Sequence, residues 1–227
     1  MRRRTVAATA CEPTRVSVYD VLTVAVLAFI GVRIASGTRL ALTGAGRGRV
    51  GIIVRGLRLR HFIPPIPVLT VVVLAVIVLV QIPLLNFGWW SALGGVGNPV
   101  TGNTERTAGT ALEWLIPLCF IVLLVPALPL FAEAEERIFR LGSEHRTQWQ
   151  RFLKGIQFGL IHALIGIPIG AALALSIGGW YFTWWYMRAY RRTGNSIAAM
   201  VESTRAHLAY NLTVVVIILA VVLLIPA

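Results

Sequence analysis

Long apolar runs alternate with short basic segments along most of this chain. The strongest runs cover residues 62–85, 111–131 and 207–225. About 20 consecutive apolar residues in a helix cross the hydrocarbon core of a bilayer, which is about 30 Å thick. The pattern predicts an all-α fold, a polytopic membrane helix bundle of about five to six spans.

The first apolar run, residues 16–32, is interrupted by Asp20 and closed by Arg33. It is compatible with a span, a hairpin or an interfacial helix, because arginines flank it on both sides. An arginine-rich stretch follows as far as residue 60. We therefore divide the chain into residues 1–60, a weak span with a basic stretch, and residues 61–227, a helical membrane domain.

Residues 152–190 are nearly all apolar and too long for one crossing. The segment "GIPIG" offers a break, because Pro168 lacks a backbone donor and glycines stand at 166 and 170. We expect a helix pair over 151–167 and 170–190, with Gly155 and Gly159 allowing close packing. Residues 192–206 should form a polar link to the last span.

The composition agrees with a membrane protein, since 57% of residues are hydrophobic, 13% are charged and the mean hydropathy is +0.77. The net charge of +12 comes from arginine clusters between apolar runs. Such clusters orient spans with the basic loops in the cytoplasm, so the charge requires no nucleic-acid partner. We expect an integral, multi-pass protein whose lipid partner is the bilayer.

The octet "EAEERIFR", residues 133–140, begins two residues after the end of the apolar run at 111–131. Helical neighbours lie three and four residues apart, which pairs Glu133 with Arg137 and Glu136 with Arg140. Glu135 has only apolar neighbours at those spacings. It therefore lies on an apolar stripe with no cation on its own helix, and we expect this carboxylate to be buried.

Two later segments carry histidines at membrane depth. "FGLIH" places Phe158 and His162 one turn apart, and "HLAYN" places His207 and Asn211 on one face of the last span. Ionisable residues within spans usually mark sites or neutral pairs. The other two histidines, His61 and His145, fall in basic flanks, and we expect both to be solvated.

Glu135, the two membrane histidines and Asn211 suit peptide hydrolysis. A glutamate and a histidine can position and deprotonate water, while a second histidine and an amide stabilise the oxyanion. The same set, Glu135, His162 and His207, would equally suit a divalent metal, most simply zinc. The residues leave both mechanisms open.

The segments "EERIFR", "FGLIH" and "HLAYN", in this order on separate spans, resemble the motifs EExxxR, FxxxH and HxxxN of the CPBP family. This family of CAAX-processing and bacteriocin-processing (Abi) membrane proteases includes the type II CAAX prenyl endopeptidase. The resemblance covers a core of about residues 111–215.

The resemblance implies a membrane endopeptidase that cleaves protein or peptide substrates, with its site toward the cytoplasm. Glu135 and His162 would activate the water, and His207 with Asn211 would stabilise the oxyanion. Supporting roles would fall to Glu136, Arg140 and Phe158. The family is described as metalloprotease, and its motifs also fit a metal-free glutamate mechanism.

Two other functions compete with peptide hydrolysis. A non-catalytic membrane scaffold or bacteriocin-immunity protein would keep the helical core without needing the site residues. A proton-coupled transporter would carry polar residues through the full thickness of its spans, whereas here they gather on one side. The sequence names no substrate.

Overall fold

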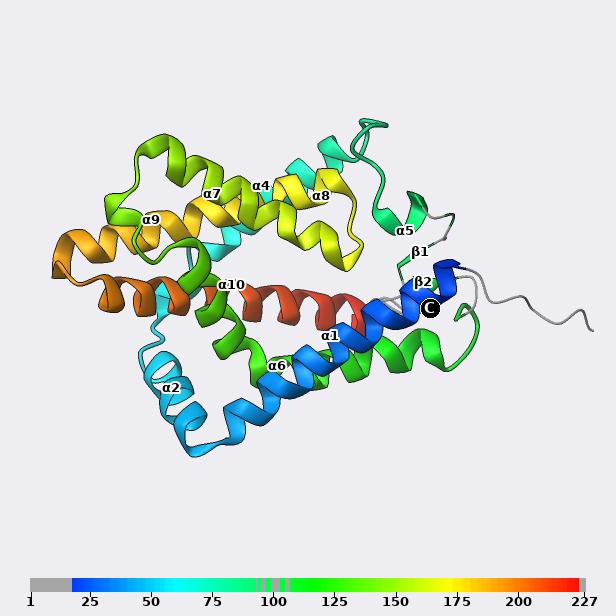
Figure 1. The fold of residues 1–227 in the computed structure, drawn as a ribbon, viewed down its shortest axis with the longest axis horizontal. Helices are drawn as coiled ribbons and strands as arrows, with labels where there is room; N and C mark the ends of the chain where they lie inside the picture. Colours follow the sequence, from blue (N-terminus) through cyan, green and yellow to red (C-terminus); the bar gives the residue numbers. More distant parts are fainter. Residues whose placement is uncertain (1–17, 93, 95–96, 99–102, 105–106, 225–227) are drawn as a thin grey trace, which may run out of the picture.

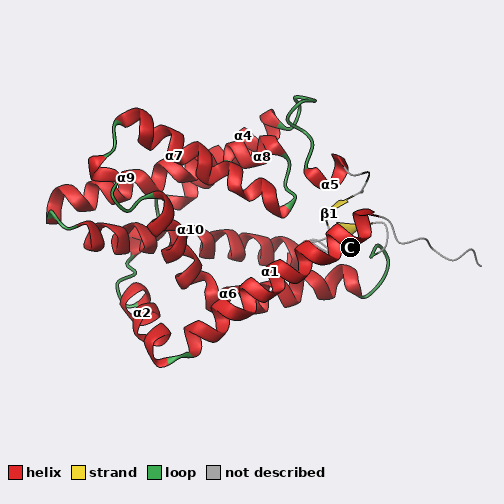
Figure 2. Cartoon of the chain, in the orientation of Figure 1, coloured by secondary structure: helices red, strands yellow, loops and turns green. Residues whose placement is uncertain are grey.

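The computed structural model describes residues 18–92, 94, 97–98, 103–104 and 107–224, and this part of the chain is almost entirely helical (Figure 2). The predicted all-α fold is confirmed. The only pairing of strands within the described residues is a two-residue antiparallel ladder. In chain order the elements are α1 (Val18–Leu42), α2 (Gly44–Val54), α3 (Leu59–Phe62), α4 (Pro65–Leu79), α5 (Trp89–Ala92), β1 (Gly97–Asn98), β2 (Asn103–Thr104), α6 (Leu112–Phe139), η2 (Ser143–His145), α7 (Gln148–Ile161), η3 (His162–Ile165), α8 (Ile169–Ala174), α9 (Ser176–Thr193) and α10 (Ser196–Leu224).

The long helices form two layers with α10 between them (Figure 1). One layer contains α4, α7, α8 and α9, and the other contains α1 and α6. Because α10 packs against both α6 and α9, side chains from these helices meet inside the bundle. This arrangement positions the candidate site.

Four helical segments are long and apolar enough to cross a membrane: Asp20–Leu42, Leu59–Leu79, Leu112–His145 and Ser196–Ala220. The prediction named five to six spans. The difference lies in the helix pair, because α7 has 14 residues and extends only about 21 Å. Helix α9 has 18 residues and ends in a group of arginines. The pair therefore lies within the bundle without either helix meeting the length and hydropathy expected of a span.

The predicted break between the paired helices is confirmed. Helix α7 ends in a short 3-10 turn, and Gly166 has a φ of +88°, a left-handed conformation that glycine adopts without strain. The predicted close packing is also present. A Cβ on Gly159 would lie 2.4 Å from the carbonyl oxygen of Ala172, so only glycine permits this approach of α7 to α8.

One predicted boundary was wrong. Helix α10 begins at Ser196, so most of the expected polar link at 192–206 is helical. The chain turns at Gly194, and the Asn195 side chain then accepts a hydrogen bond from the backbone of Ala198, which caps the new helix. Helix α6, by contrast, continues to Phe139, so the octet at 133–140 lies almost wholly within a helix, as the predicted pairing by helical spacing requires.

The basic stretch before residue 60 is also largely helical. Helix α1 continues through Arg33 and Arg39 to Leu42, and α2 begins after Thr43, whose hydroxyl accepts from the backbone of Gly46. Both helices pack against α6. Residues 1–17, on which the N-terminal topology partly depends, lie outside the described part of the chain.

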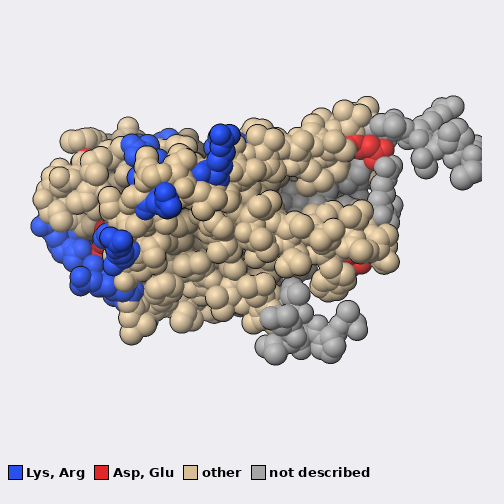
Figure 3. Space-filling model, turned by 90° about the horizontal axis from the view of Figure 1, so that it is seen from below, with Lys and Arg blue, Asp and Glu red and all other residues tan. Residues whose placement is uncertain are grey.

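Charge is distributed unevenly along the long axis of the bundle. Lysine and arginine gather toward one end of the face in Figure 3, while acidic side chains appear at the opposite end. We call the former the basic end. The asymmetry matches the alternation of apolar runs and arginine clusters in the sequence.

Candidate functional site

The centre of the candidate site is Glu136, whose side chain is fully buried. Its carboxylate lies 3.6 Å from the Arg140 guanidinium, one turn along α6, and accepts a hydrogen bond from the hydroxyl of Ser203 on α10. Arg140 also donates to the carbonyl oxygen of Gly179 on α9, at 3.0 Å. The predicted pairing of Glu136 with Arg140 is confirmed, and it fastens three helices together.

His207 on α10 lies between two carboxylates. Its Nδ1 is 2.9 Å from Glu136 Oε1, and its Nε2 is 3.6 Å from Glu135 Oε2. The imidazole is buried, whereas the Glu135 side chain is 35% exposed. The prediction treated Glu135 as the buried carboxylate, and in this respect it was wrong: its neighbour Glu136 is the buried one.

The proton positions on His207 follow from its partners. Glu136 is paired with a guanidinium and accepts from Ser203, so it is a carboxylate that also accepts a hydrogen bond from the Nδ1–H of His207. In the neutral imidazole, Nε2 then carries the lone pair. Two acceptors, Nε2 and Glu135 Oε2, therefore face each other at 3.6 Å.

Aromatic rings hold the imidazole in place. Phe182 of α9 stacks on His207 with ring centroids 4.1 Å apart, and Phe158 of α7 meets it edge-on at 5.5 Å. The guanidinium of Arg140 lies 4.2 Å from the centroid of Phe158. Together with the contact to Glu136, the two rings fix the orientation of the buried imidazole. The supporting role predicted for Phe158 rests on these contacts.

His162 lies on the other side of Phe158. Its ring is edge-on to Phe158 at 5.0 Å, and its Nδ1 lies 2.8 Å from the Phe158 carbonyl oxygen. A carbonyl only accepts, so Nδ1 carries the proton and Nε2 the lone pair. The structure thus brings Phe158, His162 and His207 together, and the histidine whose ring nitrogen lies near the Glu135 carboxylate, at 3.6 Å, is His207.

Asn211, the fourth predicted catalytic residue, follows His207 by one turn in the unbroken helix α10 and is partly exposed. The two residues therefore share a face of that helix, as the spacing predicted. Its role as an oxyanion donor stays a prediction.

Sequence reasoning missed three contributors to the site: Ser203, Phe182 and the Gly179 carbonyl. Ser203 precedes His207 by one helical turn, which is a usable signal, but the expected link at 192–206 concealed it. Phe182 and Gly179 belong to an aromatic helix whose contacts no local spacing reveals. The second predicted pair, Glu133 with Arg137, is present at 3.2 Å, and Arg49 from α2 adds a contact of 2.7 Å to Glu133.

His61 is fully buried, which contradicts its prediction as a solvated residue. Its Nδ1 accepts from the backbone N–H of Arg58 at 3.0 Å, and its Nε2 lies 3.2 Å from Glu202. The ring packs against Trp185. The neighbouring arginines, Arg58 and Arg60, are exposed, whereas His61 links α3 to α10 through Glu202. His145, by contrast, is exposed as predicted.

A zinc ion in a hydrolytic site is usually held by three protein ligands. Among the residues that the structure describes, no group of three or more His, Cys, Asp or Glu side chains is placed to hold a metal. Glu135 and His207 offer two ligand atoms, and His162 does not complete the set. Metal binding by Glu135, His162 and His207 therefore stays a prediction.

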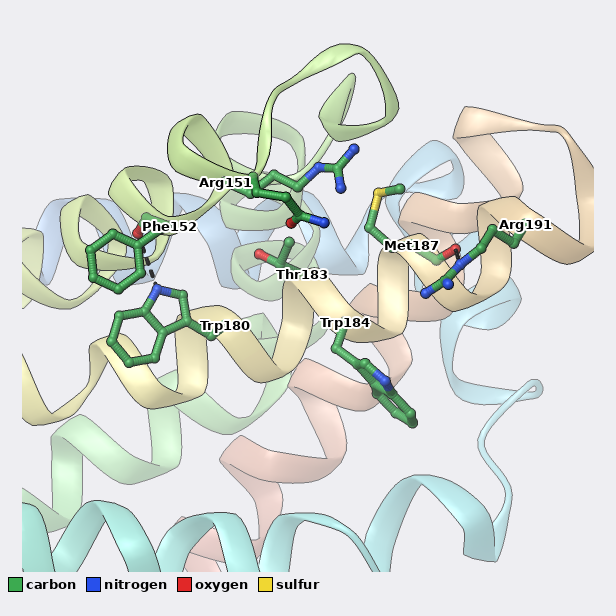
Figure 4. A pocket seen from close by; sticks show the side chains of 8 residues that line it. Arg151, Phe152, Trp180, Thr183, Trp184, Met187 and Arg191 are labelled. Carbon is green, nitrogen blue, oxygen red and sulfur yellow. Dashed lines mark hydrogen bonds between the residues drawn. The ribbon is translucent and has the colours of Figure 1, made fainter.

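A surface pocket of about 520 Å³ lies between α7 and α9 (Figure 4). Phe152 and Trp180 stack at one end, where the Trp180 indole donates to the Phe152 carbonyl oxygen, and arginines 151 and 191 flank the pocket. Thr183 lines it and donates to Gly179, whose carbonyl also accepts from Arg140. None of the predicted site residues lines this pocket.

Comparisons with known proteins found no match to this chain among family models, curated proteins or solved structures. The resemblance to the CPBP proteases therefore depends on the three short motifs alone. The function must be argued from the geometry around His207.

Proposed function

We propose that this chain is a membrane-embedded endopeptidase that hydrolyses peptide bonds of membrane-associated protein or peptide substrates. One observation carries the proposal: His207 is fixed by a buried carboxylate on one nitrogen and faces a second, accessible carboxylate with the other. A base oriented by a third group is the usual arrangement for activating a nucleophile.

In the proposed reaction, a water molecule donates hydrogen bonds to Glu135 and to Nε2 of His207. Glu135 takes a proton as the water oxygen attacks the carbonyl carbon of the scissile bond. The same proton then passes to the leaving nitrogen as the C–N bond breaks, which returns Glu135 to the carboxylate. Glu136, Arg140 and Ser203 hold His207 and do not touch the substrate.

Two further residues complete the proposal. Asn211, one turn beyond His207, would donate its side-chain N–H to the oxyanion of the tetrahedral intermediate. His162, whose Nδ1 is committed to the Phe158 carbonyl, would be the alternative acceptor at Nε2 for the second hydrogen of the water, in place of His207. Both roles depend on a substrate lying on the exposed side of Glu135.

The positive-inside rule supports an orientation with the basic end in the cytoplasm. The octet at 133–140 and the arginines of α2 share contacts through Glu133 and Arg49, so the site would open toward that side. Labelling of single cysteines at positions 47 and 113 from each side of sealed membranes would test this orientation.

A decisive experiment compares peptide N-termini in membranes that contain wild-type protein, Glu135→Gln or His207→Asn. We expect new N-termini with the wild type and their loss with both variants. Glu113→Gln is the matched control, because Glu113 lies on the same helix, far along the chain from the octet, and its carboxylate accepts from the backbone of Gly109. Unchanged cleavage in folded Glu135→Gln and His207→Asn proteins would refute the proposal.

A non-catalytic scaffold is the second candidate, and the burial of the Glu136–His207 pair favours it. A fully buried ionic network specifies how helices pack whether or not catalysis occurs. This candidate predicts that Glu135→Gln leaves the phenotype intact, because Glu135 is partly exposed and contributes little to packing. The same comparison of variants therefore separates the two functions.

A further inference from the structure

A second groove, of about 270 Å³, lies at the junction of α3 and α4 with α9. Its polar lining consists of three guanidinium groups, those of Arg60, Arg188 and Arg192. Its apolar lining includes Ile63 and Trp184, both of which are exposed. The groove shares no residue with the candidate catalytic site.

Positive charge exceeds negative charge at this groove. Glu202, just behind it, contacts Arg60 at 2.7 Å, Arg205 at 3.1 Å and Arg192 at 3.9 Å. One carboxylate thus faces three guanidinium groups. Its fourth neighbour is the ring of His61, which is neutral because its Nδ1 accepts from the Arg58 backbone. Arg188 lies over the Trp184 ring at 5.2 Å and is a fourth cation near the same place. An anion in the groove would meet uncompensated positive charge.

The surface next to the groove is apolar and faces outward. Helix α4 begins at Pro65, immediately after the groove, and is one of the candidate spans. It exposes a series of large apolar side chains: Ile66, Val71, Val73, Leu74, Ile77 and Val78. Arginines that end a lipid-facing apolar surface, beside exposed tryptophan, are typical of the depth at which phospholipid headgroups lie.

We propose that this groove binds an anionic phospholipid. The phosphate would lie among Arg60, Arg188 and Arg192, and the acyl chains would run along α4 and past Trp184. Guanidinium groups bind phosphate oxygens through paired N–H donors, and the exposed indole supplies an apolar wall. An acidic peptide would match the charge but would leave the exposed apolar surface of α4 uncovered.

The test uses the full chain in neutral detergent and native mass spectrometry with added dioleoyl phosphatidylglycerol or dioleoyl phosphatidylcholine. We expect tighter binding of phosphatidylglycerol by the wild type. Loss of one juxtamembrane arginine costs about 1 kcal/mol, so Arg188→Gln should weaken this binding about fivefold and Arg188→Gln with Arg192→Gln about 30-fold. Arg188→Lys keeps the charge but lacks the paired donors, so it should weaken binding less than Arg188→Gln does.

The matched control is Arg39→Gln, which removes another exposed charge, from α1, at a residue that does not line the groove. Equal binding of the two lipids by the wild type would overturn the proposal. So would equal losses in Arg188→Gln and Arg39→Gln, or displacement of the lipid by hexaglutamate or inorganic phosphate at the lipid's own concentration. Binding is read directly, so the result is independent of any peptidase activity.

Discussion

Two buried histidine–glutamate pairs lie in this bundle, and they differ at one nitrogen. His61 uses both ring nitrogens within the protein: Nδ1 accepts from the Arg58 backbone and Nε2 contacts Glu202. His207 uses only Nδ1 for packing, through Glu136, and its Nε2 faces the partly exposed Glu135. A buried histidine–glutamate contact by itself therefore does not indicate a catalytic site. What distinguishes His207 is that one ring nitrogen is not used in packing and lies beside a partly exposed carboxylate.

The largest effect should come from Glu135→Gln, which removes the accessible carboxylate and keeps its shape. If Glu135 accepts the proton of the attacking water, cleavage should fall about 100- to 10,000-fold. The fold should survive, because no arginine contacts this side chain within salt-bridge distance in the described residues. Cleavage rates on one substrate identified in the comparison of N-termini would measure the loss of activity. Thermal unfolding in detergent would check that the variant keeps its fold.

Glutamate-to-glutamine substitution at the next residue, Glu136, should lower the stability of the protein. Glu136→Gln leaves Arg140 buried without its carboxylate, and breaking a buried ion pair costs about 3–5 kcal/mol in free energy of unfolding. Unfolding in mixed micelles with increasing dodecyl sulfate would measure this loss. A Glu136→Gln protein as stable as Glu135→Gln would remove the distinction between the structural and the accessible carboxylate.

His61→Phe tests the other histidine pair. The substitution keeps a ring beside Trp185 but removes the acceptor for the Arg58 N–H and the contact with Glu202. We expect a loss of about 1–3 kcal/mol in stability. Cleavage per folded molecule should stay at the wild-type rate, and a selective loss of rate would mean that the two histidine pairs are functionally coupled.

The smallest effect should come from Arg137→Gln. Arg137 is about half-exposed, and Glu133 keeps its shorter contact with Arg49 when Arg137 is removed. An exposed pair one turn apart contributes about 0.3–0.5 kcal/mol. Thermal unfolding should therefore change little, and a loss comparable to that of Glu136→Gln would show that local spacing, not burial, sets the strength of these pairs.

Several features of the fold could be predicted from local patterns. Apolar run length indicated the long helices, Gly166 and Pro168 indicated the break, and four-residue spacing indicated both ion pairs of the octet. Each of these depends on neighbours within one helix, where geometry is fixed by the 3.6-residue turn. The helical start at Ser196 was missed because polar residues between apolar runs were taken for a link, although Asn195 offers a capping side chain.

The sequence by itself determined that the chain is a helical membrane protein and which polar residues fall within its apolar helices. Only the tertiary structure decided which of those residues are buried and which nitrogen of each histidine is used. Glu135 and Glu136 are adjacent in sequence, yet successive residues of a helix point about 100° apart. The packing of α6 against α10 turned Glu136 into the interior and left Glu135 at its edge, because contacts between helices depend on how whole faces fit together.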